Sequence, residues 1–289
     1  MLNLKFKDFK SQANKMVTLA SSEIYPDYLD NAITLYAPYI QEFKDLVSIS
    51  LDSKDLLRKI TLKTGKSHIQ LLRIFRKFVS PDTSVEMLKR KTKIPEIIED
   101  FGPFFKDLTT VKVALSSRPV PDEALISVLY EYKDRGQKGY DLTENFFDWF
   151  EAKFGDEFTI KGPRRAGGDV ILSDVLPDYI YRTPADFLIS RKIDKTPLVI
   201  GFARYDSDRG GSQADDRTGG NRDKIPYIAQ YSLSKGLNLK ILFLNDGPGL
   251  TLGEMWDTYA ELEEFGGDNV KVCTTKMLET RFTKEWFDN

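Results

Sequence analysis

The segment that most constrains the fold of this 289-residue chain is residues 184–224. Two short apolar runs, 186–189 and 198–202, predict adjacent strands, and the second leads directly into a group of charged, glycine and amide residues. Strands that are rich in Leu, Val and Ile, without polar alternation, are usually covered on both faces. We therefore expect a sheet between layers of helices, with a polar cluster at its edge.

The polar cluster, residues 204–217, combines glycines, arginines and carboxylates. Gly210 and Gly211 would let backbone N–H groups approach an anion, arginines offer forked donors for phosphate, and carboxylates are ligands for Mg²⁺. These groups suit a phosphodiester and a metal ion. A solvated loop with internally paired charges is the alternative. The charged and amide members are Arg204, Asp206, Asp208, Arg209, Gln213, Asp215, Asp216 and Arg217.

The elements around this cluster indicate a mixed α/β domain. An aromatic-rich helix at 142–154 precedes a strand at 158–161, and a helix starting near residue 223 follows the cluster. A fully apolar strand at 239–244, a helix at 251–265 and a strand at 270–274 complete the pattern. A right-handed crossover through residues 221–235 would make part of the sheet parallel.

Three segments of this half resemble one enzyme family. PADF at 184–187, FARYDSDRGGSQADDR at 202–217 and GPRRAGGDV at 162–170 resemble type II restriction endonucleases of the PD-(D/E)xK superfamily. The resemblance covers residues 140–250 closely and the N-terminal third only in general character. It implies a restriction-endonuclease-like core, with a central mixed sheet flanked by helices, after a helical N-terminal lobe. It also implies a homodimeric enzyme that cuts double-stranded DNA at specific sites with Mg²⁺, with a cognate DNA methyltransferase as a further partner.

The resemblance also implies catalytic residues. In that family, an Asp at the start of one strand and an (Asp/Glu)-x-Lys on the next hold Mg²⁺ and activate a water. Asp186 matches the first position, but Gly-Phe-Ala stands at 201–203 where Glu-x-Lys would fall. The second carboxylate would then come from Asp206, which we predict as the second metal ligand, or from Asp169 or Glu151. The lysine stays open among Lys161, Lys192 and Lys224. A protein that binds DNA without cutting it is the alternative.

Several basic and amide side chains in this half are candidates for DNA contacts. Arg164 and Arg165 lie in a glycine-flanked turn and suit phosphate or guanine, although an exposed loop without a partner is equally compatible. Gln213 suits the edge of an adenine. The DNA-contacting residues that we predict here are Arg164, Arg165, Arg204, Arg209, Gln213, Asp216 and Arg217.

The first half is predicted to be helical and locally basic. Residues 54–93 contain twelve Lys or Arg and three acids, an excess of nine positive charges in a chain of net charge −2. This excess favours a DNA-recognition lobe, with Arg73, Arg76 and Lys77 on a helix at 67–79. A solvated helix face is the alternative. We predict two domains, 1–135 and 136–289, with a polar boundary at 134–141.

Composition excludes several other classes of protein. His68 and Cys273 are the only histidine and cysteine, so the chain cannot form a Cys/His zinc site, a Ser-His-Asp triad or an internal disulfide. Residues 1–15 are charged throughout, and no run of 18 apolar residues occurs, which predicts a cytoplasmic protein without a membrane partner. Neither GxxxxGK[ST] nor GxGxxG is present, so the sequence gives little support to a nucleotide-handling enzyme.

Overall fold

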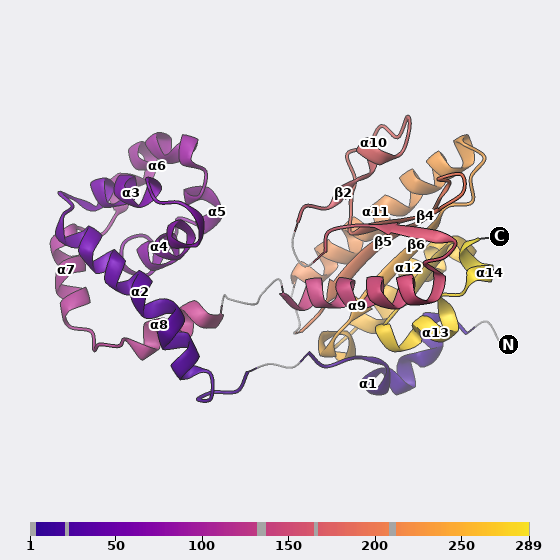
Figure 1. Cartoon of the computed structure of the whole chain (residues 1–289), viewed down its shortest axis with the longest axis horizontal. Coiled ribbons are helices and arrows are strands. Elements are labelled where there is room, and N and C mark those ends of the chain that lie inside the picture. Colours follow the sequence, from indigo (N-terminus) through magenta and orange to yellow (C-terminus); the bar gives the residue numbers. More distant parts are fainter. Residues whose placement is uncertain (1–3, 21–22, 132–136, 165–166, 208–211, 289) are drawn as a thin grey trace. The chain divides into compact units, whose positions relative to one another are not determined.

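The chain forms two compact units, which are described separately below (Figure 1). The computed structural model describes residues 4–20, 23–131, 137–164, 167–207 and 212–288, without the side chains of residues 137 and 212–218. The helical unit is Ser22–Arg135, and the α/β unit consists of Met1–Ser21 with Gly136–Asn289. Each unit encloses its own hydrophobic core.

The helical unit begins its helices with short polar side chains. Asp52, Ser84 and Asp107 each accept a hydrogen bond from a backbone N–H in the first turn of the helix that follows. The apolar faces then meet in one core around Phe43 and Phe75. The elements are α2 (Leu29–Ser48), α3 (Ser53–Thr61), α4 (Gly65–Phe78), α5 (Val85–Leu88), η2 (Lys91–Lys93), α6 (Ile94–Phe101), η3 (Gly102–Phe104), α7 (Leu108–Ser116) and α8 (Glu123–Glu131).

The α/β unit contains the strands of the described chain. Its helices are η1 (Phe6–Gln12), α1 (Ala13–Met16), α9 (Gln137–Phe154), α10 (Leu172–Val175), α11 (Ser212–Ser234), η4 (Pro248–Thr251), α12 (Met255–Gly266), η5 (Gly267–Asn269), η6 (Thr275–Met277), α13 (Leu278–Arg281) and α14 (Lys284–Phe287). Its strands are β1 (Phe158–Lys161), β2 (Val170–Ile171), β3 (Pro184–Ala185), β4 (Phe187–Arg191), β5 (Pro197–Tyr205), β6 (Lys240–Asp246) and β7 (Val270–Cys273).

Five of these strands form one mixed sheet in the order β1-β4-β5-β6-β7. The pairs β1–β4 and β4–β5 are antiparallel, and the pairs β5–β6 and β6–β7 are parallel. The parallel pair β5–β6 is possible because α11 carries the chain back between the two strands. β2 and β3 form a separate two-stranded sheet.

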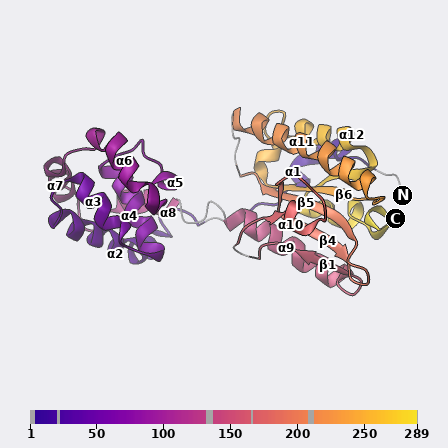
Figure 2. The same ribbon diagram turned by 90° about the horizontal axis from the view of Figure 1, so that it is seen from above.

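Helices cover both faces of the large sheet. Figure 2 shows α9 on one side and α11 and α12 on the other. On the α9 side, the ring of Phe187 packs against Phe146 and Phe147, with centroid distances of 4.9 and 5.8 Å. The same ring fills the space beside Gly201, where a Cβ atom would lie 1.9 Å from it. Position 201 must therefore be glycine for β4 and β5 to pair in this register.

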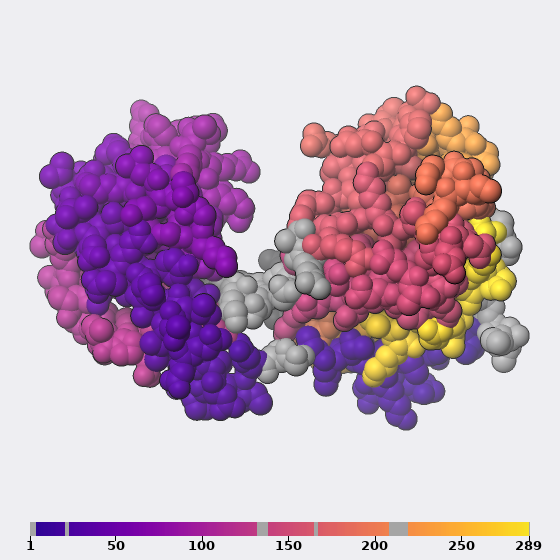
Figure 3. Space-filling model, in the orientation of Figure 1, coloured from indigo at the N-terminus to yellow at the C-terminus, as the bar shows by residue number. Residues whose placement is uncertain are grey.

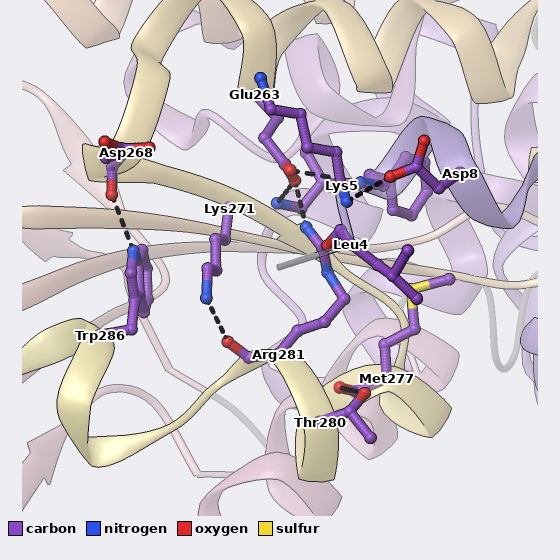
Figure 4. A network of polar contacts seen from close by, with 12 residues as sticks. Leu4, Lys5, Asp8, Glu263, Asp268, Lys271, Met277, Thr280, Arg281 and Trp286 are labelled. Atoms are coloured by element: carbon purple, nitrogen blue, oxygen red, sulfur yellow. Dashed lines mark hydrogen bonds and ion pairs between the residues drawn. The ribbon is translucent and has the colours of Figure 1, made fainter. Parts of the chain in front are cut away.

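The N-terminal segment belongs to the α/β unit, which corrects the predicted domain 1–135. Its indigo residues adjoin the yellow C-terminal residues in Figure 3. Figure 4 shows Arg281 hydrogen-bonded to the Leu4 carbonyl and to Glu263. Glu263 also accepts the N–H of Phe6 at 3.2 Å and that of Val272 at 3.1 Å. A buried ion pair therefore joins the first residues of the chain to α12, β7 and α13.

The predicted mixed α/β class is confirmed, and two predicted boundaries are wrong. The chain divides between residues 135 and 136, but α9 starts at Gln137, inside the predicted linker 134–141. Helix α11 starts at Ser212 and not near residue 223, so part of the polar cluster at 204–217 is helical.

The packing of Phe187 on Gly201 predicts a large effect for a small substitution. Gly201→Ala should lower the free energy of unfolding by about 1–3 kcal/mol, because the buried ring has no room to move away from the new methyl group. The measurement is urea-induced unfolding followed by circular dichroism.

Gly219→Ala is the matched control. No atom lies within 4 Å of a Cβ at this position in α11, so the same methyl group should raise stability by about 0.5–1 kcal/mol through helix propensity. Equal effects of the two substitutions would contradict the packing argument.

Candidate functional site

Asp186 lies in the short connection between β3 and β4 and is held against β5. Its backbone N–H donates to the Gly201 carbonyl at 2.9 Å, and its carboxylate Oδ2 accepts the Ala203 N–H at 2.8 Å. The side chain is partly buried. Strand pairing, and not a flexible loop, therefore fixes where this carboxylate lies.

Asp169 approaches Asp186 because β2 pairs with β3. Val170 is opposite Ala185, and Ile171 is opposite Pro184. The same register, continued by one residue, places Asp169 opposite Asp186. Opposite residues on antiparallel strands have Cβ atoms about 4.5–5.5 Å apart, and like charges there repel each other. Two carboxylates that are 17 residues apart in sequence are thus brought next to each other, and one of them, Asp186, is bonded to β5.

Lys224 reaches the same place from α11. Its Nζ lies 4.2 Å from the centroid of the Phe202 ring and donates to Asn221 Oδ1 at 3.1 Å. The side chain is partly buried, and its charge acts on both Asp186 and Asp169. The three side chains come from three elements and form one cluster, which we call the Asp169–Asp186–Lys224 cluster.

Burial and charge shift the pKa values of Asp186 and Lys224. Burial raises the pKa of the Asp186 carboxyl above its usual value, and the charge of Asp169 raises it further, while the Ala203 N–H and Lys224 oppose the shift. Burial lowers the pKa of the Lys224 ammonium, and both carboxylates oppose that change. The ionised form of Asp186 is incompletely compensated, so a bound cation would lower its energy.

The donor set fits a hard cation that retains other ligands. Among the described residues, no group of three or more His, Cys, Asp and Glu side chains is arranged to hold a metal ion. The cluster would supply two carboxylates, and Mg²⁺ is commonly bound by one or two carboxylates, with waters and substrate phosphate oxygens completing its octahedron. Lys224 adds a cation that can face an anionic substrate.

Asp206, our predicted second metal ligand, lies in a different environment. It is only 4% exposed, Oδ1 accepts Arg204 Nε at 2.6 Å, and Oδ2 accepts the Tyr259 hydroxyl at 3.2 Å. Both carboxylate oxygens are therefore used to join the end of β5 to α12. This geometry favours Asp169 over Asp206 as the partner of Asp186.

Glu151 is also engaged elsewhere. Its carboxylate pairs with Arg164, which in addition donates to Glu144 at 2.8 Å and to Asp148 at 3.0 Å. Hydrogen bonds to Glu151 and Glu144 raise the pKa of the Arg164 guanidinium above its usual value. Arg164 thus fastens the end of β1 to α9, and this pairing argues against its predicted contact with DNA.

The remaining predicted contact residues are distributed over both units. Arg165 and Arg209 lie outside the described residues, as do the side chains of Gln213, Asp216 and Arg217. In the helical unit, Arg73 donates to Gln70 at 3.3 Å and Arg76 to the Pro81 carbonyl at 2.8 Å; Lys77 is exposed and also interacts within the chain. The predicted DNA contacts of these residues stay predictions.

Of the three lysines left open by the sequence, Lys224 belongs to the cluster. Lys161 is exposed at the end of β1, and Lys192 donates to the Gly155 carbonyl in the turn before β1. No spacing rule in the sequence singles out Lys224, because it lies inside α11 and far along the chain from β5.

No helix within the described ranges is long and apolar enough to cross a membrane. Comparison of the chain with models of protein families, with curated proteins and with solved structures finds no match. Function must therefore be argued from the Asp169–Asp186–Lys224 cluster itself.

The raised pKa of Asp186 predicts that this residue weakens the fold. At pH 7 without added metal, Asp186→Asn should have a free energy of unfolding higher than that of the wild type by on the order of 1 kcal/mol, because a partly buried negative charge is removed. Its melting temperature should be higher accordingly. The wild type loses stability as pH rises from the usual aspartate pKa to the raised one. The advantage of the variant should therefore vanish near about pH 3 and be constant above the raised pKa.

Asp156→Asn is the control, since Asp156 is an exposed carboxylate in the turn between α9 and β1. It should leave the melting temperature unchanged at all pH values. A lower melting temperature for Asp186→Asn at pH 7 would show that Asp186 is a structural ion-pair partner.

Proposed function

We propose that this protein is a Mg²⁺-dependent DNA endonuclease whose catalytic centre is the Asp169–Asp186–Lys224 cluster. The observation that carries the proposal is the placement of two carboxylates opposite each other, with a partly buried lysine beside them. Structural ion pairs balance their charges, whereas this cluster concentrates negative charge where a cation and a phosphate could be held together.

The order of elements also supports a restriction-endonuclease-like core. The large sheet and its helices follow in the order α9, β1, β4, β5, α11, β6, with β2, α10 and β3 inserted between β1 and β4. Without this insertion the order is a helix, three strands, a helix and a strand, as expected of such a core. Asp186 lies at the start of the middle strand of the three, as the PADF segment suggests.

The absence of Glu-x-Lys at residues 201–203 has a physical explanation within this proposal. A side chain at position 201 would collide with Phe187, and the Ala203 N–H is used to hold Asp186. The second carboxylate would instead come from Asp169 on the β2 side, and the lysine from α11. The cluster would then carry the same three charges as the family motif, on different elements.

The roles of the residues follow from their charges. A Mg²⁺ ion bound by Asp169 and Asp186 would lower the pKa of a water and polarise the scissile phosphate. Asp186, fixed by the Ala203 N–H, would orient that site without rearrangement. Lys224 would offset the negative charge that develops on the phosphate during attack. A homodimer and a partner methyltransferase stay predictions.

The direct test is incubation of the purified protein with unmethylated plasmid and phage DNA, in Mg²⁺ and in EDTA. We expect discrete fragments in Mg²⁺ alone. Asp186→Asn and Asp169→Asn should each slow cleavage by about 10²–10³-fold, while Asp156→Asn should cut at the wild-type rate. A rate for Asp169→Asn equal to that of the wild type would exclude Asp169 from the centre.

Lys224 has a separate test. Lys224→Met removes the charge and keeps the apolar stem over Phe202, so cleavage should slow by about 10²-fold while the affinity for DNA, measured in EDTA, stays within about twofold. Lys224→Arg should recover part of the rate. Loss of binding together with cleavage would assign Lys224 to substrate affinity.

The departure from Glu-x-Lys favours a second candidate, a DNA-binding protein of the same fold that does not cut. Such a protein would shift DNA on a gel in EDTA and in Mg²⁺ and would give no fragments from any of the substrates tested. The same gels therefore distinguish the two functions.

A further inference from the structure

Two exposed tyrosines pack against each other, and one of them lies three residues after Lys224 on α11. The rings of Tyr181 and Tyr227 have centroids 4.2 Å apart and planes tilted by 33°. They are 36% and 42% exposed, although aromatic rings at this spacing are usually buried. The pair lies between α11 and the segment that leads from α10 to β3.

Two buried tyrosines, Tyr179 and Tyr231, support the exposed pair. Tyr179 packs edge-on against both Tyr181 and Tyr231, at 5.8 and 5.3 Å. The Tyr179 hydroxyl is hydrogen-bonded to the Thr183 hydroxyl at 3.0 Å, and the Tyr231 hydroxyl donates to the Pro177 carbonyl at 3.0 Å. The exposed rings therefore rest on a buried, hydrogen-bonded base, so their position is fixed before any ligand arrives.

Both exposed rings are tied to the catalytic cluster through the backbone. Tyr227 follows Lys224 by three residues on α11, and residues at this spacing are neighbours on one helix face. Tyr181 precedes Asp186 by five residues and leads into β3, whose pairing with β2 brings Asp169 and Asp186 together. A strand bound at the cluster would thus pass the tyrosine pair within a short distance.

The surrounding charge indicates what the pair could bind. Arg182, next to Tyr181, is exposed, and Lys224 lies three residues before Tyr227 on α11. Aromatic faces next to cations suit a nucleotide, whose base stacks while its phosphate meets the positive charge. An apolar peptide or a lipid chain would gain nothing from these cations.

We propose that Tyr181 and Tyr227 form a stacking platform for a nucleobase of the DNA strand held at the Asp169–Asp186–Lys224 cluster. This inference depends on the proposed function in that it takes DNA as the ligand, but it does not require cleavage. The bases of a regular duplex hide their faces in the stack, so the platform must receive an unpaired base or one displaced from the duplex. Displacement is easiest at mismatched or single-stranded positions.

The test compares two fluorescent oligomers of equal length and charge, a thymidine oligomer and an abasic one that keeps the sugar-phosphate chain. Binding is measured by fluorescence anisotropy in EDTA at low salt, where no cleavage occurs. The wild type should bind the thymidine oligomer about tenfold more tightly than the abasic one. Equal affinities would overturn the platform.

Variants then assign the preference to these two rings. Tyr181→Leu and Tyr227→Leu should each reduce the tenfold preference to about twofold or less and leave binding of the abasic oligomer unchanged, while Tyr→Phe at either position should retain it. Tyr25→Leu, which removes an exposed ring of the helical unit, is the matched control and should behave as the wild type. Loss of abasic binding in the Leu variants would indicate a structural role and contradict the proposal.

Failure of the platform is distinguishable from failure of the nuclease. A wild type that prefers the thymidine oligomer but cuts no DNA would keep the platform and reject the endonuclease. A wild type that cuts DNA but binds both oligomers equally would do the reverse.

Discussion

The register of β4 against β5 is the constraint on which the candidate site depends. The ring of Phe187 occupies the space that any side chain at position 201 would need, so β5 can accept β4 at one register only. A slip by one residue would turn every side chain of β4 to the opposite face of the sheet. Because Asp186 immediately precedes Phe187, the same contact that completes the apolar core also directs the carboxylate to the Ala203 N–H.

The site therefore combines a rigid scaffold with an unfavourable charge. Asp169 and Asp186 repel each other, burial penalises the ionised form of Asp186, and Lys224 compensates only in part. Other buried acids of the unit are well satisfied: Asp246 accepts backbone N–H groups from Thr18, Gly247 and Thr275. The contrast distinguishes a carboxylate that stabilises the fold from one that the fold holds in place at a cost in stability.

The sequence predicts the positions of elements whose pattern lies within one short segment. The apolar run at 239–244 located β6 closely, because burial of consecutive residues is visible in a single segment, and the predicted strand at 158–161 coincides with β1. The partners of Asp186 were not visible in this way. Asp169 meets it through strands of two residues each, too short to show a period, and Lys224 depends on the path of α11. Asp206 lies in the polar cluster of the sequence, but its oxygens bind Arg204 and Tyr259, which no sequence pattern reveals.

The ion pair of Glu263 and Arg281 fastens the first residues of the chain to a surface made of its last ones, and the whole helical unit lies between them in sequence. During synthesis the chain emerges from its N-terminus, and domains generally fold as units while it does so. The helical unit is thus synthesised before α12 and β7 have left the ribosome, whereas residues 4–18 have nothing to dock on until the segment from Glu263 to Arg281 has been made. The α/β unit should therefore acquire its final stability later than the helical unit, which precedes α12 and β7 in sequence and can fold first.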